Sequence, residues 1–182
     1  MTQSAESTNS TWIASVLERY EGKLVRYAAR IVGDWDRARD VVQETMLRLC
    51  HAPRSDVEDH LAEWLYTVCR NRALDVCRKE RRMTLLDDAQ ASSRPSTCPT
   101  PAESAEVRDD AINLKRELEA LPPRHQEVVR LRFEGGLSYR EISRVTKHSE
   151  SYVGVLIHEG LKRLRQRMTH QTTPHTPLAQ GE

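Results

Sequence analysis

Apolar residues recur along most of this chain three and four positions apart, which is the spacing of an α-helix with one buried face. The clearest stretch is 61–82, which contains neither Gly nor Pro. Its apolar positions are Leu61, Leu65, Val68, Cys69, Ala73, Val76 and Cys77. This pattern predicts one long helix with its apolar face in a hydrophobic core. Because alternating strand patterns between turn residues are nearly absent, we predict an all-α fold.

The same periodicity predicts two helices before the long one. The first begins at Thr11 and ends at Gly33, since glycine suits the left-handed backbone that follows a helix. Asp34 can cap the second helix, because its carboxylate can accept a hydrogen bond from a free backbone N–H group. The positions that the second helix is expected to bury are Ala38, Val41, Val42, Thr45, Met46 and Leu49.

The opposite side of this second helix combines acidic and amide groups with one leucine. Its members are Asp40, Gln43, Glu44 and Leu47. A single exposed leucine is common on protein surfaces and needs no explanation. Because this leucine lies in a patterned polar face, the face is a candidate docking surface.

The predicted elements form a small N-terminal domain. Pro53 ends the second helix, and the polar stretch 51–60 is expected to be a loop. Together with the long helix, this gives a domain of three to four helices over residues 11–83. The small polar residues 1–10 are expected to be unstructured.

The composition changes after the first domain. Residues 84–106 are acidic, rich in Pro, Ser and Thr, and without a helical stripe, which predicts a flexible linker. Helical periodicity then resumes over 107–168, interrupted by Pro122–Pro123 and by Gly135–Gly136. We therefore predict a second small helical domain there, and an unstructured tail over 169–182.

The last part of the second domain has the pattern of a helix-turn-helix. Ser138 and Glu141 form an S-x-x-E capping box that opens a short helix. A tight turn follows at 146–148, and Ser149 caps a longer helix. That helix is expected to bury Val153, Ile157, Leu161 and Leu164. An ordinary helical hairpin is the alternative interpretation.

Two helices carry basic faces although the net charge of the whole chain is only +1. From Arg70 to Arg82 the long helix holds six basic residues against Asp75 and Glu80. A helix that buries one face in a core and exposes a basic face can lie along a phosphate backbone. An ordinary solvent-exposed surface without a binding role is the alternative interpretation. The longer helix of the helix-turn-helix ends in four further basic residues, Lys162, Arg163, Arg165 and Arg167. These suit phosphates, while Glu150, Ser151 and Tyr152 in its first turn are closest to base edges.

Other classes of function find little support in the sequence. The N-terminus lacks the regions of a signal peptide, and no apolar run approaches the length of a membrane span, so we expect a cytoplasmic protein without membrane insertion. The four cysteines have no zinc-site spacing and are expected to be reduced and structural. The seven histidines are scattered, and His158 suits packing or phosphate contact better than metal ligation. We expect no metal, no cofactor and no enzymatic activity.

Three segments in this order resemble the extracytoplasmic-function (ECF) class of bacterial RNA polymerase sigma factors. They are RDVVQETMLRL (39–49), WLYTVCRNRALDVCRKERR (64–82) and LPPRHQEVVRLRFEGGLSYREIS (121–143). The resemblance covers about residues 11–168. It implies sigma region 2 in the first domain and sigma region 4 in the second, with no domain between them.

The resemblance also implies a role for each surface. The docking face, with Asp40, Gln43, Glu44 and Leu47, would bind the clamp helices of the largest subunit of core RNA polymerase. The loop at 51–60 would hold a base flipped out of the non-template strand, and the linker would thread toward the active-site cleft. The residues implied to contact the −10 element are Arg70, Asn71, Arg78, Lys79, Arg81 and Arg82. Those implied to contact the −35 element are Arg140, Ser149, Glu150, Ser151, Tyr152, His158, Lys162 and Arg163. Members of this class often have an anti-sigma factor as a further partner.

The chain departs from the family pattern in the helix-turn-helix. Lys147 stands where the turn usually carries Gly, which costs on the order of 1 kcal/mol if the backbone there is left-handed. His148 replaces a small apolar residue, and Glu159 replaces a common Arg. Gly154, Val155 and Leu156 stand at positions that are often basic or polar. We therefore expect base readout to be weak beyond the first turn of the helix.

Two other functions remain open on the sequence alone. A stand-alone helix-turn-helix regulator would bind duplex DNA without polymerase and would leave the docking face without a role. A protein that binds polymerase but lacks promoter activity would fit the atypical recognition helix. Changing Glu44 to Arg together with Leu47 to Ala separates the first alternative from a sigma factor, because only a sigma factor loses activity.

Overall fold

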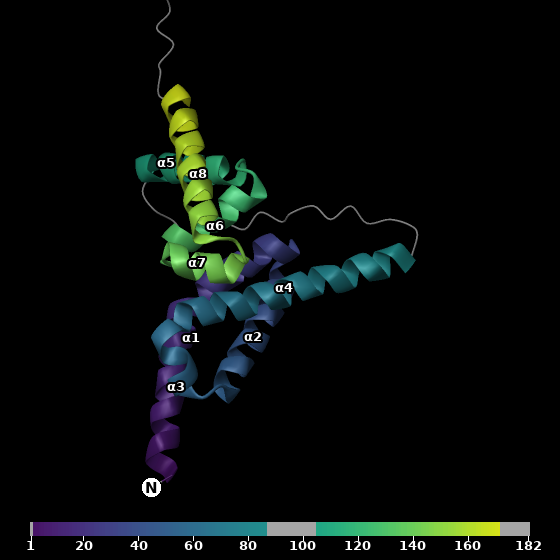
Figure 1. The fold of residues 1–182 in the computed structure, drawn as a ribbon, viewed down its shortest axis with the longest axis vertical. Helices are drawn as coiled ribbons and strands as arrows, with labels where there is room; N and C mark the ends of the chain where they lie inside the picture. Colours follow the sequence, from purple (N-terminus) through teal and green to yellow (C-terminus); the bar gives the residue numbers. More distant parts are fainter. Residues whose placement is uncertain (1, 87–104, 172–182) are drawn as a thin grey trace, which may run out of the picture. The chain divides into compact units, whose positions relative to one another are not determined.

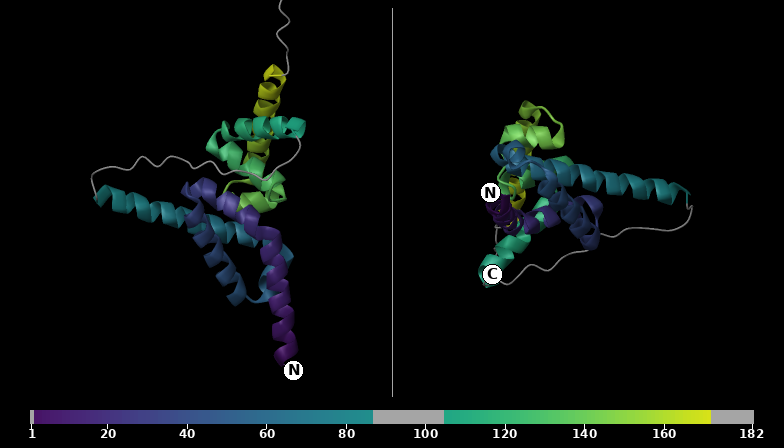
Figure 2. Two further views of the ribbon diagram at one scale, coloured as in Figure 1. Left: turned by 180° about the vertical axis from the view of Figure 1, so that it is seen from behind. Right: turned by 90° about the horizontal axis from the view of Figure 1, so that it is seen from below.

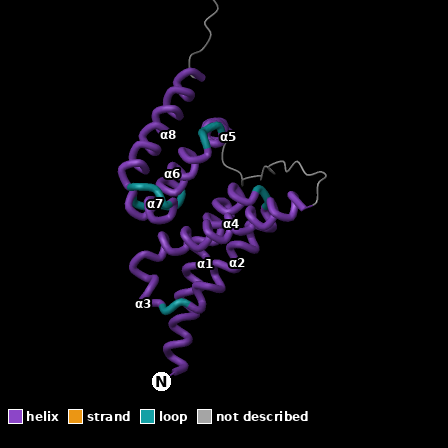
Figure 3. The backbone as a smooth tube through the Cα atoms, turned by 45° about the vertical axis from the view of Figure 1, so that its right-hand side comes forward, coloured by secondary structure: helices purple, strands orange, loops and turns teal. Residues whose placement is uncertain are grey.

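The computed structural model describes residues 2–86 and 105–171, which form helices joined by short connections (Figure 1). Within these two ranges there is no β-strand, as the tube drawing also shows (Figure 3), and the predicted all-α fold is confirmed. The chain divides into two compact units. One contains α1 to α4 and the other contains α5, α6 and α8, and α7 is described with the latter because it connects α6 to α8. Most of the predicted linker and most of the predicted C-terminal tail lie outside the described residues.

The N-terminal unit is built on three helices that pack against one another. Their bounds are Thr2–Val32 for α1, Trp35–His51 for α2 and Leu61–Leu86 for α4. α1 packs against α2 and α4, and α2 packs against α4, as can be followed in Figure 2. Their shared core includes Leu24, Val41, Leu49, Leu65, Tyr66, Cys69 and Ala73. Tyr27 of α1 meets Tyr66 of α4 edge to face, with 5.2 Å between the ring centroids.

The start of α2 follows the sequence prediction in detail. Gly33 has a φ of 75°, so it supplies the left-handed backbone that ends α1. The Asp34 carboxylate accepts a hydrogen bond of 2.9 Å from the backbone N–H of Arg37. The buried side of α2 consists of the six residues predicted from the periodicity: Ala38, Val41, Val42, Thr45, Met46 and Leu49.

Two predictions about the N-terminal unit were wrong. α1 begins at Thr2, so residues 2–10 are helical rather than unstructured, and no Gly or Pro in this stretch stops the helix. The stretch 51–60 is not a loop, because α3 (Arg54–Val57) and a 3₁₀ helix (Glu58–His60) occupy most of it. Arg54 donates two hydrogen bonds to Glu58, of 2.9 and 2.5 Å, and this pair four residues apart stabilises the turn.

The C-terminal unit places its longest helix against two others. The bounds are Ala105–Glu119 for α5, Pro123–Phe133 for α6, Tyr139–Thr146 for α7 and Glu150–Gln171 for α8. α8 packs against α5 and α6. A core cluster there contains Leu121, Val129 and Leu164, with Leu118 and Leu161 packed against it. Pro123 occupies the first turn of α6, where its missing N–H removes no hydrogen bond of the helix.

Candidate nucleic-acid and polymerase interfaces

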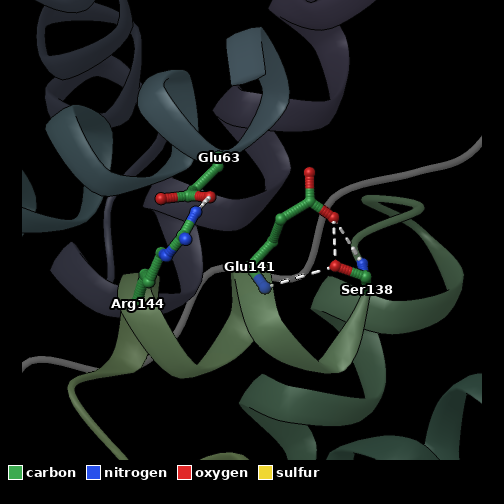
Figure 4. Close-up of polar contacts among 4 residues, drawn as sticks. All are labelled: Glu63, Ser138, Glu141 and Arg144. Atoms are coloured by element: carbon green, nitrogen blue, oxygen red, sulfur yellow. Dashed lines mark hydrogen bonds and ion pairs between the residues drawn. The ribbon is translucent and has the colours of Figure 1, made fainter. Parts of the chain in front are cut away.

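The capping box predicted at the start of α7 is present (Figure 4). The backbone N–H of Ser138 donates to Glu141 Oε2 at 2.7 Å, and the Ser138 hydroxyl donates to the same oxygen at 2.6 Å. In return, the backbone N–H of Glu141 donates to Ser138 Oγ at 3.3 Å. These reciprocal bonds satisfy backbone donors that would otherwise lack a partner at the first turn of a helix.

The connection between α7 and α8 is a tight turn with a left-handed residue in it. Lys147 has a φ of 62°, so this lysine adopts the conformation that glycine usually supplies. The Ser143 hydroxyl donates a hydrogen bond of 2.8 Å to the carbonyl oxygen of His148. Ser149 Oγ accepts a hydrogen bond of 3.3 Å from the backbone N–H of Tyr152, which is the predicted cap of α8. The local geometry is that of a helix-turn-helix.

α8 separates cleanly into an inner and an outer face. The inner face holds the buried residues Val153, Leu156, Ile157, Gly160 and Leu164. Leu161, which was predicted to be buried, is half-buried against the same core cluster. Leu156 therefore belongs to the core, which explains why an apolar residue stands there.

The residues predicted to contact the −35 element are all accessible on the C-terminal unit. Arg140 is exposed on α7, and Ser149 is exposed just before α8. The exposed members on α8 itself are Glu150, Ser151, Tyr152, His158, Lys162 and Arg163. The structure thus brings these side chains onto one unit with free access to solvent, as binding to DNA requires, and their contacts with DNA stay a prediction.

Glu159 is held by a residue of another helix. Its Oε2 lies 3.0 Å from Nε2 of His125 on α6, and the His125 ring is largely buried. This hydrogen bond is the main reason why the pKa of the Glu159 carboxyl is lowered, so the group stays ionised near neutral pH. Glu159 thus connects α8 to α6, a role that the sequence pattern did not indicate.

The residues predicted to contact the −10 element lie along α4. Asn71, Arg78, Lys79, Arg81 and Arg82 are exposed, and Arg70 is half-buried. The acidic residues of this half-helix have basic neighbours, since Glu80 forms an ion pair with Arg37 of α2 and Asp75 lies 3.3 Å from Arg78. The outer face of α4 therefore keeps an excess of positive charge. A hollow of about 220 Å³ beside it is lined by Ile31, Leu74, Cys77, Arg78 and Arg81.

The docking face of α2 is exposed at three of its four predicted positions. Asp40 and Gln43 are exposed, and Leu47 is 60% exposed. Glu44 is half-buried, and its carboxylate lies 3.0 Å from Nη2 of Arg48 and 2.5 Å from Nε of Arg72 on α4. Glu44 thus ties α2 to α4. Sequence reasoning missed this pairing because it depends on the distance between two helices.

The cysteines of the described residues are free thiols. Cys50 is exposed, Cys69 is buried and Cys77 lies between these extremes. Burial raises the pKa of the Cys69 thiol to about 12, so this thiol stays neutral.

Among residues 2–86 and 105–171 no group of three or more His, Cys, Asp or Glu side chains could hold a metal ion. Within the same residues, every helix is too short or too polar to cross a membrane.

Comparison with known proteins agrees with this arrangement. Residues 16–83 match Sigma-70 region 2 and residues 118–166 match Sigma-70 region 4. The N-terminal unit therefore carries Sigma-70 region 2 and the C-terminal unit carries Sigma-70 region 4, which defines a sigma factor of the Sigma-70 type.

Relatives that match over most of their length indicate which subclass of sigma factor this is. The ECF RNA polymerase sigma factor SigL of Mycobacterium tuberculosis is 28% identical over 163 residues, which cover 88% of this chain and 91% of SigL. SigM of Bacillus subtilis, also an ECF sigma factor, is 25% identical over 84% of this chain and 93% of its own length. The chain belongs to the ECF RNA polymerase sigma factors. It binds core RNA polymerase and promoter DNA, and it directs promoter-specific initiation of transcription.

A solved structure has the same fold. The sigma factor RpoE from Bartonella quintana, crystallised in complex with the anti-sigma factor NepR, superposes with a TM-score of 0.63. The match covers 86% of this chain and 96% of RpoE at 20% sequence identity. At this identity the match concerns the fold alone.

Proposed function

We propose that three surfaces of the described residues divide the work of initiation between them. The exposed part of the docking face, Asp40, Gln43 and Leu47, binds the largest subunit of core polymerase. The basic outer face of α4 contacts the melted strand of the −10 element. The outer face of α8 lies in the major groove of the −35 element, and Lys162 and Arg163 bind phosphates.

The observation that carries this proposal is the two-sided character of α2, α4 and α8. Each helix fills a hydrophobic core with one face and presents polar or charged residues on the other. For α4 and α8 the outer charge is basic, which suits a phosphate backbone. For α2 the outer face combines Asp40 with the 60% exposed Leu47, which suits a protein surface better than DNA.

The protein contributes binding energy rather than bond-making chemistry. Flipping a base out of the stack costs a few kcal/mol, which contacts to the opened strand must offset. α3 and the 3₁₀ helix stand where a loop was expected, and the Arg54 guanidinium lies 5.1 Å from the Trp12 ring of α1. We infer that this segment is held rigidly and receives the flipped base. The work takes place in the cytoplasm, where promoters and core polymerase are found.

An anti-sigma factor is the further partner that we propose. The RpoE structure, which this chain resembles in fold, was solved with such a protein bound. Leu47 offers an exposed apolar anchor for either partner, so an anti-sigma factor that covers α2 would compete with polymerase.

The test is multi-round transcription with core bacterial RNA polymerase on a pool of promoter fragments from the source genome. We expect transcripts from a discrete set of start sites that depend on the protein. The variant Asp40→Arg with Leu47→Ala is expected to lose core binding and transcription while its circular dichroism spectrum stays unchanged. Glu44→Arg is less suitable, because the new guanidinium would face Arg72 and loosen the contact between α2 and α4.

A matched control makes the same chemical changes on another surface. Leu17→Ala with Glu18→Arg removes one exposed leucine and reverses one exposed carboxylate on α1. This control is expected to transcribe normally. Equal loss in both variants, or transcription that survives in the α2 variant, would contradict the assignment of the docking face. Duplex binding without any core binding would favour a stand-alone regulator instead.

A further inference from the structure

The outer face of α8 has an apolar residue at its centre. With 3.6 residues per turn, Val155 lies about 200° around the helix from the buried Val153, and therefore opposite the core. Val155 is 50% exposed. By the same geometry Ser151 lies one turn before it and Lys162 two turns after it, on the same outward line.

Several neighbouring positions leave this central position open. Glu159 is held by His125 of α6, and its carboxylate is thereby turned to a neighbouring helix. The Tyr152 ring meets the His148 ring edge to face at 5.2 Å between centroids. Gly154 has no side chain, and Leu156 is buried in the core. The two methyl groups of Val155 are therefore exposed in the middle of the outer face, among Ser151, His158 and Lys162.

Only one group on a base edge matches such a surface. The major groove presents hydrogen-bond donors and acceptors from all four bases, and in addition the C5-methyl group of thymine. Valine can neither donate nor accept a hydrogen bond through its side chain, so a polar base edge placed against it would lose its water without compensation. A thymine methyl group gains an apolar contact in the same place.

We infer that Val155 selects a thymine in the −35 element by contact with its C5-methyl group. The inference rests on the proposed function, in which the outer face of α8 lies in the major groove. It adds one apolar contact to a readout that is expected to be weak beyond the first turn of the helix. A single exposed valine is ordinary elsewhere on a surface, but here it lies on the side of the helix opposite the core.

The experiment removes the same contact from either side. Holoenzyme is first used in the transcription assay to define an active promoter. Each thymine of its −35 element is then replaced by uracil, which keeps every hydrogen-bonding group and lacks only the methyl. For wild-type protein we expect one position at which binding falls roughly four-fold, the factor that corresponds to one buried methyl group at about 0.8 kcal/mol.

The Val155→Ala variant is expected to bind the thymine promoter more weakly by a similar factor. Its binding should not change when uracil replaces thymine at that position. Lys162→Ala serves as the matched control on the same face. It should weaken binding to the thymine and uracil promoters by the same factor, so the difference between them remains. Both altered side chains are exposed, and circular dichroism verifies that each variant is folded. Uracil effects that are absent, or that are equal in wild type and Val155→Ala, would overturn the inference.

The failure of this inference is distinguishable from the failure of the proposed function. If the protein directs no specific start sites, the promoter needed for the uracil series is never obtained, and the placement of α8 in DNA is itself wrong. If start sites are obtained and uracil has no effect at any position, the sigma activity stands and the role of Val155 is refuted.

Discussion

Two glycines of α8 meet very different surroundings. A Cβ atom added at Gly160 would lie 2.9 Å from Cγ2 of Val129 and 3.6 Å from Cβ of His125, both on α6. A Cβ atom added at Gly154 would lie 3.8 Å from the Tyr139 ring, which is an ordinary contact. Gly160 therefore permits the close approach of α6 and α8, while Gly154 only lowers the helix propensity.

These surroundings predict opposite effects of the same substitution. Gly154→Ala is expected to raise the free energy of unfolding of the C-terminal unit by about 0.5–1 kcal/mol, because alanine favours the helix. Gly160→Ala is expected to lower it by about 1 kcal/mol or more, because overpacking outweighs that gain. Urea unfolding followed by circular dichroism measures both. Fluorescence of Trp12, Trp35 and Trp64, which all lie in the N-terminal unit, serves as the control. If both variants changed the free energy of unfolding in the same direction, the close approach of α6 and α8 at Gly160 would be contradicted.

Lys147 stores strain in the turn of the helix-turn-helix, since its φ is 62°. Lys147→Gly is expected to stabilise the unit by about 0.5 kcal/mol, because relief of left-handed strain exceeds the entropy that glycine adds to the unfolded chain. Lys162→Gly inside α8 should do the reverse and cost about 1 kcal/mol. The midpoint of urea unfolding distinguishes the two. A lower midpoint for Lys147→Gly would argue against strain at this position.

At the scale of elements, local signals were predicted well and contacts between helices were not. The caps at Asp34, Ser138 and Ser149 were visible in the sequence because each depends on residues within three positions of the helix start. The buried side of α2 was visible because helical periodicity alone determines it. The pairings of Glu44 with Arg72 and of Glu159 with His125 join different helices, and no periodic pattern encodes such a distance.

The stretch 51–60 shows how composition can mislead. Its polar and charged residues were interpreted as a loop, yet the spacing of Arg54 and Glu58 is that of an ion pair along one helix face. Pro53 was interpreted only as the end of α2, although it directly precedes α3. A helix of four residues makes only about one turn, so it contains no repeating apolar pattern from which it could be predicted.

The capping box of α7 supplies a prediction at this scale. Ser138→Ala removes both hydrogen bonds of the hydroxyl and is expected to cost about 1 kcal/mol of stability. Ser151→Ala, at an exposed position inside α8, is the matched control and should change stability by less than about 0.5 kcal/mol. Thermal unfolding followed by circular dichroism compares them. If Ser138→Ala were no more harmful than the control, the box would contribute nothing to the stability of the unit.

At the scale of the whole molecule, the net charge of +1 conceals where the charge lies. Residues 84–110 hold two basic and six acidic residues, while 111–182 hold twelve basic and eight acidic residues. The C-terminal part of the chain therefore has a clear excess of positive charge, which suits its proposed contact with DNA, even though the chain as a whole is nearly neutral.

This distribution predicts how binding depends on salt. Arg163→Ala is expected to weaken holoenzyme binding to specific and unrelated duplexes alike and to reduce the slope of log K against log salt by about 1. Fluorescence anisotropy over a series of KCl concentrations measures the slope. Arg39→Ala on α2, at a basic residue paired with Asp36, should leave the slope unchanged. A slope that Arg163→Ala does not alter would remove this residue from the phosphate contacts.

The division of α8 into an inner and an outer face limits how its specificity can be redesigned. Stability depends on the buried residues Val153, Leu156, Ile157, Gly160 and Leu164, which tolerate few substitutions. Under the proposed function, recognition is left with the exposed outer face, which includes Ser151, Val155, His158 and Lys162. A combinatorial library restricted to these four codons should therefore yield mostly folded variants with new promoter preferences. In a library that randomises all of α8, most variants would carry changes in the buried face and would not fold.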